Sequence, residues 1–180
     1  MRRLLLAALL CIFMFNLTSA QVFNTASTLK KGQWALGFEP AILAGDNIED
    51  LYIFGYGGVG ITSGVDLGLR VGLGEETYFG GDVEFMLGKN FSISAGAHSW
   101  YNFGLDGTAL LSFPIGKNGV FFTGFDMDID FAENETYTPA WIPVGVEIKI
   151  KKSMAFMFEA NINVIEDYYH FIGGGLMLYF

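Results

Sequence analysis

The sequence predicts an all-β protein, a closed antiparallel barrel of about ten strands in up-and-down order. Apolar residues alternate with glycine or acidic residues in segments of about ten residues, and turn residues separate the segments. After residue 15 no apolar run approaches the roughly 20 residues that a spanning helix needs. Aromatic residues make up 16% of the chain, and 24 of its 180 residues are glycine. These features are typical of a transmembrane β-barrel.

The first 20 residues predict a cleaved signal peptide. Two arginines precede an apolar run from Leu4 to Phe15, and Thr18 and Ala20 occupy the −3 and −1 positions of a small-residue cleavage site. The apolar run is too short for a transmembrane anchor. We therefore expect residues 1–20 to be removed, residues 21–31 to form a short periplasmic segment and residues 32–180 to form the barrel.

The mature chain is expected to be acidic and free of cysteine. Loss of Arg2 and Arg3 from the 10 basic residues leaves 8 against 19 acidic residues, a net charge of −11. This charge argues against nucleic acid as a partner. The one cysteine, Cys11, leaves with the signal peptide, and a lipoprotein site there is disfavoured because Leu10 before it is not small.

Strands are predicted in order from the period-two alternation. In "VDLGLRVGLG" (65–74) the residues Val, Leu, Leu, Val and Leu face one way, and Asp, Gly, Arg, Gly and Gly face the other. "YFGGDVEFML" (78–87), "VFFTGFDMDIDF" (120–131) and "IPVGVEIKI" (142–150) repeat the pattern. The predicted strands span about 33–43, 51–61, 65–74, 78–88, 91–101, 103–113, 120–131, 140–150, 154–164 and 170–180.

Two of these strands change parity. In the second strand Tyr52, Phe54 and Tyr56 share one face, whereas Val59 and Ile61 have the other parity. A β-bulge at Gly57-Gly58 would restore the register, and Gly173–Gly175 could do the same in the last strand.

A soluble barrel with an apolar interior is the main alternative fold. Its outer face would carry Lys and Glu, whereas the polar face here is Gly, Ser, Thr and Asp. Ten strands of large apolar side chains would also crowd an interior that eight strands nearly fill. Only a lipocalin-like ligand cavity would relieve this crowding, so the apolar face is expected to lie outside.

The turns predict two rims of opposite charge. Alternate turns hold acids (Asp46, Glu49, Asp50, Glu75, Glu76, Glu133, Glu135, Glu166, Asp167) or lysines (Lys89, Lys117, Lys151, Lys152), and Lys30 and Lys31 precede the first strand. Aromatic residues near both rims predict belts at the headgroups of a bilayer. The expected belts are Tyr52, Tyr78, Trp100, Tyr101, Tyr137, Trp141, Tyr168 and Tyr169 at the acidic rim, and Trp34, Phe91, Phe121, Tyr179 and Phe180 at the basic rim.

The chain resembles the small outer-membrane β-barrel proteins of Gram-negative bacteria. "GITSGVDLGLRVGLG" (60–74) is similar to a hairpin of that group, and "GGLMLYF" (174–180) is similar to its β-signal. The resemblance implies an outer-membrane location and recognition of Leu176, Leu178 and Phe180 by the barrel-assembly machinery. Tyr179 is a departure, because it adds an aromatic residue at the penultimate position.

The inward face is expected to be acidic. Its predicted lumen acids are Glu39, Asp66, Asp82, Glu84, Asp106, Asp126, Asp128, Asp130, Glu147 and Glu159, and its lumen cations are Arg70 and Lys149. Because the acids outnumber the cations, some must be solvated, be protonated or hold a cation. A wetted lumen wall is preferred to a divalent-cation site, and no cofactor is expected.

His98 raises one catalytic alternative, because it lies near the acidic rim at the height of Asp106 and Asp130. Some ten-stranded outer-membrane barrels are proteases that use Asp and His at that rim, but the strands and loops here are shorter. We therefore expect a structural or accessory barrel without catalytic activity, which contacts outer-membrane lipid and docks with an envelope protein. A narrow cation-preferring pore or small-ligand carrier is the alternative, and a rim-type hydrolase is a minor one.

Overall fold

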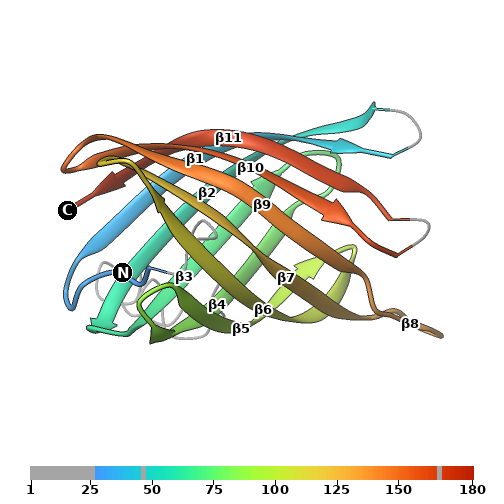
Figure 1. The fold of residues 1–180 in the computed structure, drawn as a ribbon. Helices are drawn as coiled ribbons and strands as arrows, with labels where there is room; N and C mark the ends of the chain where they lie inside the picture. The colour runs from blue at the N-terminus through green and yellow to red at the C-terminus, as the bar shows by residue number, and fades with distance from the viewer. Residues whose placement is uncertain (1–26, 46–47, 166–167) are drawn as a thin grey trace, which may run out of the picture.

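A computed structural model describes residues 27–45, 48–165 and 168–180, and the predicted signal peptide lies outside this part of the chain. Its strands form one closed sheet (Figure 1). They are β1 (Trp34–Ala44), β2 (Ile48–Thr62), β3 (Val65–Leu73), β4 (Tyr78–Gly88), β5 (Phe91–Trp100), β6 (Asn102–Ile115), β7 (Gly119–Phe131), β8 (Thr136–Tyr137), β9 (Ala140–Lys151), β10 (Met154–Asn163) and β11 (His170–Tyr179).

Within residues 27–45, 48–165 and 168–180, no helix is long and apolar enough to cross a bilayer.

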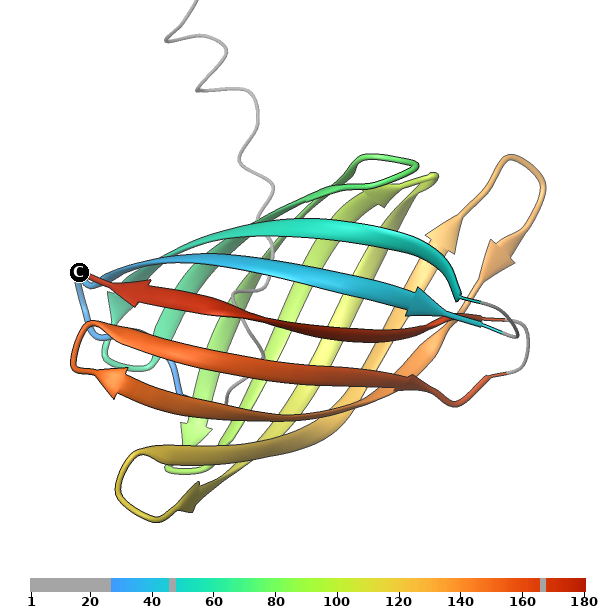
Figure 2. The ribbon, with the colours of Figure 1, turned by 90° about the horizontal axis from the view of Figure 1, so that it is seen from above.

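Each long strand pairs antiparallel with the next long strand along the chain. The ring closes where β1 pairs with β11, with Ala35 opposite Tyr179. β7 pairs with β6 on one side and β9 on the other, and the short β8 pairs only with the end of β7. Figures 1 and 2 show β8 at one end of the barrel. The predicted antiparallel up-and-down barrel of ten strands is confirmed.

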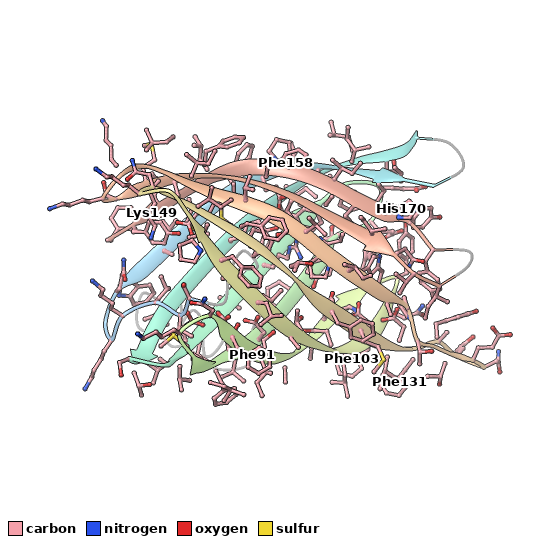
Figure 3. All side chains as sticks on the ribbon, in the orientation of Figure 1. Phe91, Phe103, Phe131, Lys149, Phe158 and His170 are labelled. Carbon is pink, nitrogen blue, oxygen red and sulfur yellow. The ribbon has the colours of Figure 1, made fainter. Side chains whose placement is uncertain are left out.

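The barrel wall has an apolar outer face and a mixed inner face. On β3, Leu69 is 45% exposed whereas Asp66 is 7% exposed. On β10, Phe158 is 47% exposed whereas its neighbour Glu159 is 3% exposed. Figure 3 labels further aromatic residues with exposed side chains, which are Phe91, Phe103 and Phe131. This arrangement is the inverse of a soluble barrel, which buries its apolar face.

The two predicted β-bulges are wrong. β2 pairs without interruption from Ile53 to Gly60 against β3, and β11 pairs without interruption from Phe171 to Leu178 against β10. The register shifts of β2 lie at its two ends, between Gly60 and Thr62 in its pairing with β3 and beside Leu43 and Ala44 in its pairing with β1. The parity of β2 is therefore constant, and the side chains of its aromatic residues at 52, 54 and 56 are buried inside the barrel.

Charge separates between the two ends of the barrel. The turns after β3 and β7 place Glu75, Glu76, Glu133 and Glu135 at one end, here called the acidic rim. Lys30, Lys31, Lys89, Lys117, Lys151 and Lys152 lie at the other end, here called the basic rim. The side chains of four predicted rim acids, Asp46, Glu49, Glu166 and Asp167, lie outside the described residues. Lys149 and His170 mark opposite ends in Figure 3.

The segment before β1 packs into the basic end of the lumen. Leu29 is buried with the barrel core, and its backbone N–H donates to Asp66 Oδ2 at 2.7 Å. Gly32 follows with a φ of 77°, and its N–H donates to the carbonyl of Gly60 at 2.8 Å. Gly60 is required here, because a Cβ would collide with the backbone of Lys30. Leu29, in the segment predicted as periplasmic, thus contacts the barrel interior, whereas Lys30 and Lys31 are exposed at the basic rim.

Candidate functional site

Apolar side chains fill part of the basic half of the lumen. Phe122, Met157 and Met177 are almost fully buried and belong to one cluster with Ala35. We call these three large side chains the apolar plug. Gly145 makes room for it, because a Cβ at this position would collide with the ring of Phe122. Interiors packed in this way leave little space for a water column.

Arg70 occupies the middle of the lumen. Its Nη2 donates to the hydroxyl of Tyr56, which in turn donates to Glu39, and its Nη2 lies 3.7 Å from Glu39 Oε2. The guanidinium carbon lies 4.4 Å from the ring centroid of Phe54 and 5.7 Å from that of Tyr78. A guanidinium that stacks on aromatic faces and pairs with a carboxylate is well suited to burial. Arg70 is thus mainly the counterion of Glu39.

His98 lies among three carboxylates on the way to the acidic rim. Its Nδ1 lies 3.3 Å from Asp106 Oδ2, and its Nε2 lies 3.0 Å from Asp130 Oδ1 and 3.8 Å from Asp128 Oδ2. We call these four residues the His98 cluster. Asp126, on the same face of β7, instead accepts a hydrogen bond from Thr108 Oγ1 at 2.5 Å.

Strand register explains why the His98 cluster forms. Across β5, β6 and β7, His98 lies opposite Gly104, which lies opposite Asp130. Two residues further along each of these strands, Gly96 lies opposite Asp106, which lies opposite Asp128. The glycines leave the space that the larger side chains fill: a Cβ at 104 would collide with the His98 ring and Asp130, and one at 96 with Asp106.

Aromatic side chains close much of the lumen near the acidic rim. Trp100 packs edge-on against Tyr52 at a centroid distance of 5.7 Å, and its Nε1 donates to the Tyr52 hydroxyl at 3.1 Å. Trp141 packs against Phe171 at 6.0 Å. The prediction that Tyr52, Tyr78, Trp100 and Trp141 form an interfacial belt is wrong, because all four line the lumen. Tyr101, Tyr137 and Tyr169 are exposed at this rim.

A small cavity lies between the aromatic side chains and the charged groups. Its volume is about 70 Å³. Its lining includes Arg70, His98, Asp106 and Asp128 together with Trp100. The space is sufficient for a few water molecules, since a cavity of about 10–15 Å³ measured in this way already holds one. It is too small for a drug-sized ligand, which needs about 300 Å³ or more.

A second acidic group lies nearer the basic rim. Asp66 and Glu84 are opposite each other on β3 and β4, and Asp82 is two residues along β4. All three are buried. Within the described residues, Asp82 Oδ2 and Glu84 Oε1 have no hydrogen-bond partner.

The remaining predicted residues lie at the ends of the barrel. Lys149, predicted as a lumen cation, has a 55% exposed side chain at the basic rim, 3.9 Å from Glu147. It therefore balances little of the lumen charge. Leu176, Leu178 and Phe180 are exposed on the outer face of the closing strand and its end. The prediction that Tyr179 belongs to the aromatic belt at the basic rim is wrong, because this side chain turns inward and its hydroxyl donates to Glu147 at 3.3 Å.

Sequence reasoning missed the apolar plug and the aromatic lining of the lumen. The parity of β2 carried the signal, because its aromatic residues alternate with the outward Leu51 and Ile53. Glycines opposite large residues were a second signal, as at Gly145 and Gly104.

Neither a protein-family model nor a curated protein matches the chain. Among solved structures, KdgM porin matches with a TM-score of 0.49 and 8% identity, over 80% of this chain and 98% of that chain. The N-terminal barrel domain of Pseudomonas aeruginosa OprF matches with a TM-score of 0.41 and 13% identity, over 84% and 100%. A structure from the de novo design of transmembrane β-barrels matches with a TM-score of 0.42 and 13% identity, over 84% and 98%. The fold described above follows from this chain's own strand pairing, and its function is inferred from its own residues.

Proposed function

We propose that this protein is an outer-membrane β-barrel of a Gram-negative bacterium with a structural or accessory role, and that its lumen is closed to ions. The outer face supports the membrane location. Long side chains such as Leu69, Phe125 and Ile148 are exposed on it, although each would lose about 1.5–3 kcal/mol of burial energy in water. Lipid would cover this face, and the long strands, of 9 to 15 residues, reach the length that a tilted strand needs to cross a bilayer.

The apolar plug is the observation that carries the closed-lumen proposal. Phe122, Met157 and Met177 each have at most 1% of their surface exposed. Ten strands enclose little more space than the eight that side chains already fill, and open channels are found nearer sixteen strands. Ions crossing the barrel would have to displace these side chains.

The proposal includes the absence of catalysis. Both ring nitrogens of His98 face carboxylates within the cluster. A general base needs a free lone pair within hydrogen-bond reach of the substrate. The cavity beside it is also small for a peptide or a sugar.

Planar-bilayer recording of the purified barrel across a salt gradient tests the closed lumen. We expect no conductance steps from the wild type and small cation-selective steps from Met157→Ala with Met177→Ala, because the opened lumen is lined with acids. Phe121→Ala, on the outer face beside Phe122, is the matched control for loss of packing without opening.

A cation-preferring pore is the second candidate, and the excess of inward acids favours it. Cation-selective steps from the wild type, as large as those of the double variant, would establish the pore and overturn the closed lumen. Large anion-selective steps would contradict both proposals.

A further inference from the structure

The His98 cluster has the geometry of a metal site. One ligand atom each from His98, Asp128 and Asp130 lie within 4.8 Å of one another. Asp106 approaches the other ring nitrogen of His98 at 3.3 Å. Two ligands of one metal ion are separated by at most about twice the metal–ligand distance of 2.0–2.2 Å, so a small shift would bring these atoms around one ion. We propose that the His98 cluster binds one divalent transition-metal cation of the zinc class.

The donor set selects the class of metal. An imidazole nitrogen with carboxylate oxygens suits zinc and its neighbours in the first transition row, whereas calcium and magnesium prefer oxygen alone. His98 supplies the nitrogen, and Asp128 and Asp130 supply the oxygens. Asp106 then orients the imidazole through its second nitrogen, as carboxylates do for many zinc-bound histidines.

The neighbouring cavity leaves room for a fourth ligand. His98, Asp106 and Asp128 all line it. Asn161 also lines it, and the Oδ1 of Asn161 is buried without a hydrogen-bond partner among the described residues. A water molecule held between the ion and this oxygen would complete a four-coordinate site. The Nδ2 of the same side chain donates to Glu159 Oε1 at 2.6 Å, which fixes the amide while its Oδ1 stays without a partner among the described residues.

Charge also favours a cation at this position. Asp106, Asp126, Asp128 and Asp130 lie on two adjacent strands, β6 and β7, and face the lumen. Arg70 lines the same cavity but is paired with Glu39 and Tyr56, and His98 is the basic side chain in direct contact with Asp106, Asp128 and Asp130. Uncompensated carboxylates in a low-dielectric interior are costly, and a divalent cation removes that cost.

The glycines around the cluster show that space is reserved for it. Gly80 and Gly104 flank His98 on the two neighbouring strands, and a Cβ at either position would collide with the His98 side chain. Gly96 performs the same role for Asp106. Glycines on β4, β5 and β6 therefore leave the space in which His98 and Asp106 fit together.

The test is Zn²⁺ titration of the folded, chelator-treated barrel in detergent by calorimetry. We expect the wild type to bind one Zn²⁺ per chain, and Co²⁺ to give visible absorption bands that Zn²⁺ removes. Loss of an outer-shell partner weakens metal binding by about 10–100-fold, so His98→Asn, which removes a ligand, should weaken it by at least about 100-fold. Asp106→Asn should fall in the range of about 10–100-fold.

His170→Asn is the matched control, because His170 is exposed on β11 and lies outside the cluster. The His170→Asn variant should bind Zn²⁺ like the wild type. Both variants retain every acid of the acidic rim, so nonspecific binding of Zn²⁺ at that rim would be the same in both. Absence of stoichiometric Zn²⁺ binding by the wild type would overturn the proposal and leave a histidine–aspartate ion-pair network. Equal affinities of the wild type and His98→Asn would overturn it as well, because the ion would then bind at the rim. Either result leaves the closed-lumen proposal unaffected, since conductance tests that separately.

Discussion

At the scale of the residue, single glycines decide where the large lumen side chains lie. Gly145 admits the ring of Phe122, and Gly104 admits His98 and Asp130. These glycines lie in extended strands, so they are needed because they lack a Cβ and not because of an unusual backbone angle. Their positions can be found in the sequence, but their partners cannot, because the partners come from other strands.

Gly145→Ala should destabilise the barrel by about 1–3 kcal/mol, as overpacking of a filled interior does. The added methyl group collides with the Phe122 ring and the carbonyl of Phe158. Urea unfolding in lipid vesicles measures the change. Gly57→Ala is the control, because its Cβ would find only an ordinary contact with Leu36 at 3.8 Å. Equal stabilities of the two variants would contradict a tightly packed plug.

Leu69→Arg should destabilise the barrel in lipid by about 2–4 kcal/mol, because it places a charge in the hydrocarbon near mid-strand. Leu73→Arg, on the same face of β3 but at its end, should cost only about 0–1 kcal/mol. Both leucines are exposed on the outer face. Unfolding in vesicles ranks them, and a larger cost at Leu73 would mean that the membrane does not cross β3 at this height.

At the scale of the element, the strands were predictable and their contacts were less so. Alternation located all ten long strands because one face of each is almost entirely apolar, as on β3. It gave no clear facing for β2, where both faces carry large apolar side chains: aromatic residues face the lumen, and Leu51 and Ile53 face outward with Gly55 and Gly57 on the same face. The height of His98, Asp106 and Asp130 along their strands was predicted, but their distances depend on the register of β5, β6 and β7.

Phe180→Asp should reduce the assembled amount in cells far more than its effect on stability in detergent implies. The resemblance of "GGLMLYF" to a β-signal motivates this prediction, since one exposed Phe contributes only about 1.5–3 kcal/mol. Phe91→Asp is the control, as Phe91 is also exposed on the outer face near the basic rim. Quantitative blotting of heat-modifiable barrel measures assembly. Equal deficits in both variants would remove a specific role for Phe180 in recognition.

At the scale of the whole molecule, the barrel separates three environments. An apolar outer face surrounds the wall, acids and lysines mark opposite rims, and a layered lumen runs from the apolar plug to the aromatic side chains near the acidic rim. The two faces follow from the alternation of side chains along each strand, and the two rims follow from the antiparallel up-and-down order, which places successive turns at opposite ends. The central claim is that lipid covers the outer face of the barrel and that the apolar plug closes its lumen.

Spin-label accessibility along β7 in lipid vesicles tests this claim most directly. Single cysteines at 121, 123, 125, 127, 129 and 131 should show high contact with oxygen dissolved in the bilayer, and a cysteine at 122 should show low contact with oxygen and with a water-soluble nickel chelate. Accessibility should therefore drop at 122 between the two outward positions 121 and 123, as the period of two requires. High nickel accessibility at 122 would reveal a water-filled lumen, and high nickel accessibility at 125 and 127 would reveal an outer face in water; either result would contradict the account.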